Sequence, residues 1–112
     1  MPGMRLKKDS QGKDLITIMS EKERVSVICK GNVQGIGFRY IIRKEAIKFN
    51  LKGYVMNLRD GSVEIIAEGS KDNIRGLVLF IRSDPGSSRI EEIDIKRSSP
   101  LGEFTAFSIK YD

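Results

Sequence analysis

Apolar residues along the chain follow two different spacings, and each spacing predicts one kind of element. In the stretch 24–30 (RVSVICK) apolar and polar side chains largely alternate, which predicts a β-strand with one buried face. From Phe38 to Asn50 apolar residues recur at positions 38, 41, 42, 46 and 49, the stripe typical of an amphipathic helix. Asn50 is a residue type that can close such a helix in the left-handed conformation.

The rest of the chain shows the same two spacings. The triplet Arg59-Asp60-Gly61 is short enough to form a hairpin turn, so the strands on either side of it are expected to be antiparallel. Ser70 is a good N-cap, and the breaker at 84–86 (DPG) ends the helix that follows it. The predicted elements beyond Asn50 are strands over 51–58, 62–68, 90–97 and 105–111, and one helix between Ser70 and residue 84.

This order, β-α-β-β-α-β with an extra short C-terminal strand, predicts an α+β fold. The matching plan is the ferredoxin-like sandwich, an antiparallel sheet with two helices on one face. At 112 residues the chain is long enough for one domain. Residues 1–22 are polar and lack sustained periodicity, so we expect them to be a flexible N-terminal extension, with the folded domain at 23–112.

The composition limits the partners and the chemistry. The formal net charge of +5 suits an anionic partner. No apolar run reaches about 18 residues, and the N-terminus lacks an apolar secretory core, so we expect no membrane contact and a cytoplasmic location. With no histidine and a single cysteine, catalytic triads and zinc sites are implausible. We therefore expect no metal and no cofactor, and we interpret Cys29 as a core residue.

The stretch Gly31–Tyr40 (GNVQGIGFRY) is the strongest candidate for chemistry. It holds three glycines within seven positions, between a predicted strand and a predicted helix. Glycine lets the backbone approach a ligand closely, and successive amides before a helix N-terminus form a nest that binds anions. Arg39 lies at the junction, where its guanidinium could grip two phosphate oxygens. The simpler alternative is a glycine-rich turn with a surface arginine. The side chain of Gln34 could equally point to the loop or be polar filler.

Two blocks of the chain resemble the acylphosphatase family. Residues 31–39 (GNVQGIGFR) are similar to its signature loop G-x-V-Q-G-V-x-F-R, with Ile36 in place of the second valine. Residues 53–64 are similar to its second block, G-x-V-x-N-x-x-D-G-x-V-E. The resemblance implies a small hydrolase that cleaves carboxyl-phosphate anhydrides into a carboxylate and inorganic phosphate, without a metal or organic cofactor.

The resemblance also implies roles for particular residues. Arg39 corresponds to the substrate-binding arginine, and Asn57 to the asparagine that orients the attacking water. The phosphate cradle corresponds to the loop amides of Gln34, Gly35, Ile36, Gly37, Phe38 and Arg39. Because an acyl phosphate has a weakly basic leaving group, a site without a general acid is sufficient. We hypothesise that a phosphate oxygen of the substrate takes the proton of the water.

The expected partners are a small acyl phosphate, inorganic phosphate or other oxyanions, bound by a monomer. One alternative is a non-catalytic, anion-binding regulatory module of the same fold. Another is a nucleic-acid-binding domain, which would suit the basic charge. Domains of that type stack bases on aromatic residues of their central strands. The predicted strands 24–30 and 62–68 contain no aromatic residue, so we expect no nucleic-acid partner.

Overall fold

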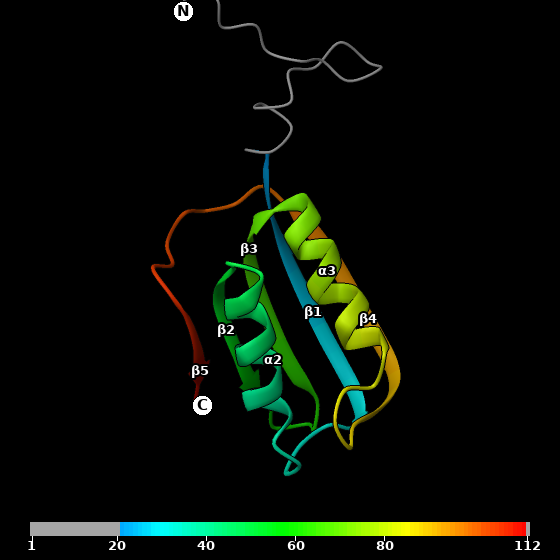
Figure 1. Ribbon diagram of the computed structural model, residues 1–112. Coiled ribbons are helices and arrows are strands. Elements are labelled where there is room, and N and C mark those ends of the chain that lie inside the picture. Colours follow the sequence, from blue (N-terminus) through cyan, green and yellow to red (C-terminus); the bar gives the residue numbers. More distant parts are fainter. Residues whose placement is uncertain (1–20, 112) are drawn as a thin grey trace, which may run out of the picture.

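A computed structural model describes residues 21–111 of the chain (Figure 1). The elements are β1 (Lys22–Asn32), α2 (Phe38–Lys48), β2 (Lys52–Asn57), β3 (Val63–Ser70), α3 (Lys71–Arg82), β4 (Arg89–Ser98) and β5 (Phe107–Lys110). Their order is the predicted one, and most boundaries shift by one or two residues. Residues 1–20 of the predicted extension lie outside the described residues, and β1 already begins at Lys22.

The five strands form one sheet in the order β4-β1-β3-β2-β5. The first four strands pair antiparallel, which confirms the ferredoxin-like plan predicted from the sequence. The extra strand β5 pairs parallel with β2, so the sheet as a whole is mixed rather than antiparallel throughout. The reason is the route of the chain: after β4 it crosses to the opposite edge of the sheet before it starts β5 (Figure 1).

Both helices lie on the same face of the sheet and bury its apolar side chains (Figure 1). The alternating residues Val25, Val27 and Cys29 of β1 are completely buried, and Phe38 and Ile42 of α2 pack in the same core. Burial raises the pKa of the Cys29 thiol to about 12. The thiol is therefore protonated at neutral pH and is a small core side chain, as expected from its place in the strand pattern.

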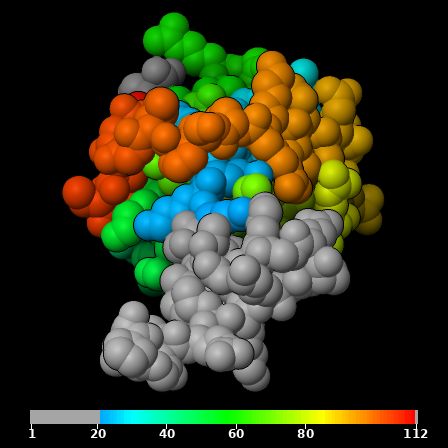
Figure 2. All heavy atoms as spheres, turned by 90° about the horizontal axis from the view of Figure 1, so that it is seen from above, coloured from blue at the N-terminus to red at the C-terminus, as the bar shows by residue number. Residues whose placement is uncertain are grey.

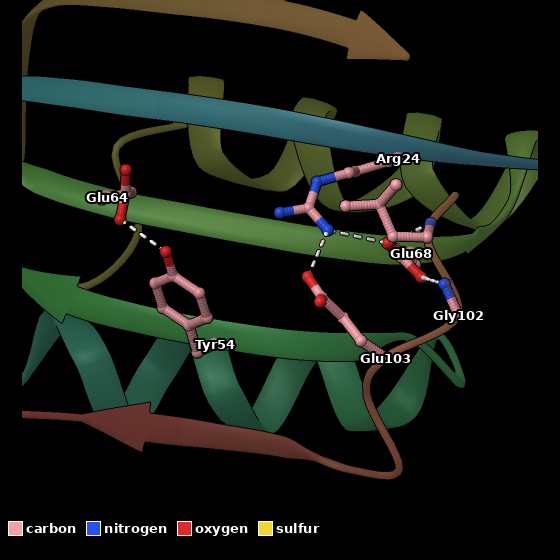
Figure 3. A network of polar contacts seen from close by, with 7 residues as sticks. Arg24, Tyr54, Glu64, Glu68, Gly102 and Glu103 are labelled. Atoms are coloured by element: carbon pink, nitrogen blue, oxygen red, sulfur yellow. Dashed lines mark hydrogen bonds and ion pairs between the residues drawn. The ribbon is translucent and has the colours of Figure 1, made fainter. Parts of the chain in front are cut away.

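The other face of the sheet holds the segment between β4 and β5 in place through Glu68 (Figure 3). The Glu68 carboxylate accepts hydrogen bonds from the backbone N–H groups of Leu101 (2.9 Å) and Gly102 (3.0 Å). It also pairs with the Arg24 guanidinium at 2.9 Å. Figure 2 shows this segment, in orange, crossing the end of the molecule from β4 toward the C-terminal strand. These contacts fix the path that leads to β5.

Candidate functional site

The glycine loop lies at the end of the molecule where β1 ends and α2 begins (Figure 1). The turn between β2 and β3 lies at the same end, because β1 and β2 both run toward it (Figure 1). Asn57 is the last residue of β2 and so stands at this end as well. The fold therefore brings together the two blocks, 31–39 and 53–64, that the sequence singled out.

The loop backbone exposes amide groups rather than pairing them. Gly35 and Gly37 have φ angles of 75° and 79°, which side chains other than glycine rarely adopt. Gly37 is the N-cap of α2, which has no side-chain cap and no acidic residue in its first turn. Within the loop, the Val33 N–H donates to Gly31 O. The next backbone hydrogen bond along the chain is the one from the Ile41 N–H, in α2, to Gly37 O. The N–H groups from Gln34 to Tyr40 thus donate to no backbone carbonyl of residues 21–111, and they can serve an anion.

Arg39 is half-buried in the first turn of α2. Its guanidinium carbon lies 5.1 Å from the centre of the Tyr111 ring, a cation–π contact that restricts where the charged group can go. A cation at a helix N-terminus opposes the helix dipole. A bound anion between the open amides and the guanidinium would resolve this conflict.

Asn57 carries a buried acceptor without a partner. Because side chains alternate along a strand, Asn57 shares the helix-covered face of β2 with the fully buried Val55. Its Oδ1 atom is inaccessible to solvent and accepts no hydrogen bond from the described residues. Buried polar atoms are almost always paired, so this acceptor is free to take a hydrogen bond from a water molecule or a ligand at the end of β2.

The side chain of Gln34 matches neither of the two predicted arrangements, because it is neither turned to the loop nor without a specific contact. Its side chain points away from the loop, and Nε2 donates to the carbonyl oxygens of Leu58 and Ser62, each at 2.8 Å. Only its backbone amide belongs with the exposed donors of the loop. Phe38 is buried in the core and Ile36 packs against it, so these residues too contribute backbone rather than side chain. Gly35 and Gly37 are exposed.

Sequence reasoning missed two features of this region. The contact between Tyr111 and Arg39 depends on the parallel pairing of β5 with β2, which no periodicity reveals. The hydrogen bonds of Gln34 join segments more than twenty residues apart, and no local pattern predicts their direction.

Within residues 21–111, no group of three or more His, Cys, Asp or Glu side chains is placed to hold a metal ion. Nor does any helix there have the length and apolarity to span a bilayer.

Fold and site together define a class: a ferredoxin-like sandwich with a glycine-rich loop of open backbone amides between its first strand and first helix. The family model described as acylphosphatase matches residues 25–109. An acylphosphatase of Caldivirga maquilingensis is 40% identical over 95 residues, which cover 84% of this chain and all of the relative. The crystal structure of the acylphosphatase from Bacillus subtilis superposes with a TM-score of 0.76 at 37% identity, covering 80% of this chain and 99% of that one.

The similarity extends to a third relative. The structure of an acylphosphatase from Coxiella burnetii has a TM-score of 0.74 at 28% identity, and the match covers 80% of this chain and 93% of that one. The chain belongs to the acylphosphatase family. It is accordingly a hydrolase that acts on acyl phosphates, small molecules in which a carboxyl group is joined to phosphate.

Proposed function

We propose that this acylphosphatase binds the phosphoryl group of its substrate between the loop amides and the Arg39 guanidinium. The open N–H groups of Gln34 to Tyr40 support this assignment, and so does the N-terminus of α2, which has no side-chain cap and no acidic residue in its first turn. Several amides and a planar guanidinium can bind a phosphoryl dianion from different sides. Such donors stabilise the charge on the equatorial oxygens in the transition state, which supplies most of the catalysis in phosphoryl transfer.

Asn57 is proposed to orient the attacking water. Its unpaired Oδ1 can accept a hydrogen bond from a water molecule, and its Nδ2 group can donate a hydrogen bond to the same or another oxygen. The water oxygen attacks phosphorus in line with the acyl oxygen, the bond between phosphorus and that oxygen breaks, and the carboxylate leaves with the electron pair. A phosphate oxygen takes the proton of the water. The buried, unpartnered Oδ1 is the single observation that carries this role.

The role of Arg39 is tested by hydrolysis of benzoyl phosphate. Arg39→Ala is expected to lower kcat/KM about 10³-fold, because the variant loses the one cation proposed to contact the transferred group. Arg75→Ala, which removes an exposed arginine from α3, is the matched control and should hydrolyse benzoyl phosphate at the wild-type rate. Near-normal turnover by Arg39→Ala would contradict the role.

The same assay tests the metal-independent mechanism and the alternative of anion binding without turnover. Wild-type activity is expected to be unchanged after treatment with a chelator, because no proposed step uses a metal. Loss of activity on chelation would contradict this. A protein that binds phosphate but releases no benzoate would instead be a regulatory module. The monomeric state, the cytoplasmic location and the absence of a nucleic-acid partner remain predictions made from the sequence.

A further inference from the structure

The amide group of Gln34 bridges the glycine loop and the turn that follows Asn57. Both of its Nε2–H groups are in use, one toward Leu58 O and one toward Ser62 O, each at 2.8 Å. These two carbonyls belong to the residues that close the turn, since Leu58 N–H donates to Ser62 O at 2.8 Å. Gln34 therefore holds the turn at its base, directly after the residue proposed to orient water.

The turn does not need Gln34 in order to form. Leu58 O also accepts the N–H of Gly61 at 3.2 Å, and Ser62 O accepts the N–H of Leu58. Asp60 adds a further contact, because its Oδ1 accepts from the Ser62 N–H at 2.9 Å. Without the glutamine, both carbonyls would keep a backbone partner and the turn would keep its shape. What the glutamine adds is the connection from this turn to the loop.

We infer that Gln34 is a positioning residue that fixes Asn57 relative to the phosphate-binding loop. The inference rests on the proposed function of Asn57. A carboxamide fits this position because its two N–H groups match two carbonyl acceptors. In-line attack depends on the placement of the water to within a fraction of an ångström, and a displacement of about 1 Å can reduce the rate about 10²-fold. Gln34 thus affects the chemical step, through Asn57, more than it affects phosphate binding.

A double-mutant cycle with benzoyl phosphate tests this inference. Gln34→Met keeps the length of the side chain and removes both donors. It is expected to lower kcat about tenfold, with the inhibition constant of inorganic phosphate changed less than about twofold. In the Asn57→Ala background, the same substitution should leave kcat unchanged, because the group that Gln34 positions is already gone. Thermal unfolding of each variant shows that the fold persists, and Gln34→Glu provides a second variant without the donors.

Two outcomes would overturn the inference. One is an equal loss of kcat from Gln34→Met in the wild-type and Asn57→Ala backgrounds, which would make the two residues independent. The other is a wild-type kcat in both Gln34→Met and Gln34→Glu. A wild-type kcat in the single variant Asn57→Ala is a different result, because it would contradict the proposed function of Asn57 itself.

Discussion

A single atom, Oδ1 of Asn57, links the structure to the proposed chemistry. A buried acceptor without a hydrogen bond costs about 1–3 kcal/mol. Proteins keep such groups where function requires them, at the expense of stability. Arg39, the other proposed catalytic residue, is likewise placed against the local electrostatics, since a cation at the start of α2 opposes the helix dipole. Both residues are easier to explain by a bound phosphoryl group and water than by folding.

This cost leads to a prediction about stability. Asn57→Ala is expected to have a free energy of unfolding equal to that of the wild type or up to about 1 kcal/mol higher, because the unpaired acceptor is removed. Urea unfolding measures the difference. Val55→Ala, on the same face of β2 and completely buried, is the control and should lose about 2 kcal/mol. A clear loss of stability in Asn57→Ala would show that Oδ1 has a stabilising partner.

At the scale of elements, Glu68 holds the segment that leads to β5, whereas β5 itself pairs with β2. Burial of this carboxyl would raise its pKa, but hydrogen bonds from the Leu101 N–H, the Arg24 guanidinium and the Gly102 N–H outweigh burial and hold the pKa below its ordinary value of 4.5. Arg24 also stacks over the Phe104 ring, at 5.5 Å from its centre. One charged group on β3 therefore fastens the segment that carries the chain to β5 and Tyr111.

The lowered pKa of Glu68 gives this attachment a pH dependence. The stabilisation by the Glu68 carboxylate is fully present above pH 4.5 and is lost as the pH falls through the lower pKa of the folded state. Glu68→Gln should therefore destabilise the protein by about 1–2 kcal/mol at neutral pH, and the difference from the wild type should shrink in acid. Urea unfolding of the variant and the wild type, at neutral pH and again at acid pH, checks this, with the exposed Glu91→Gln as control. A difference that stays constant with pH would contradict it.

At the scale of the whole molecule, the sequence predicts the layers but not all of the neighbours. Val25, Val27 and Cys29 alternate because one face of β1 is buried, and the same requirement produces the helical stripe of α2. These patterns are local and can be read directly. The parallel pairing of β5 with β2 depends on the path across the sheet, which local patterns do not record.

In the site, too, the features that come from a local stretch of sequence could be predicted, and those that depend on contacts between distant segments could not. The glycine loop and Arg39 could be found from residue types and their spacing, because an anion-binding nest requires a continuous stretch of backbone. The role of Asn57 could be expected only from the resemblance to a family, since one asparagine near a strand end carries little information. The direction of Gln34 could not be predicted, because its acceptors, the carbonyls of Leu58 and Ser62, come from the next hairpin.

The central claim is that one end of the molecule separates two tasks: the loop and Arg39 bind the phosphoryl group, and Asn57 delivers the water. The most direct test is to measure kcat for benzoyl phosphate and the inhibition constant of inorganic phosphate for Asn57→Ala, beside Asn73→Ala on α3 as control. The account predicts a fall in kcat of about 10²-fold or more for Asn57→Ala, with phosphate inhibition within about threefold of the wild type. A variant that loses its affinity for phosphate but keeps its kcat would contradict the account.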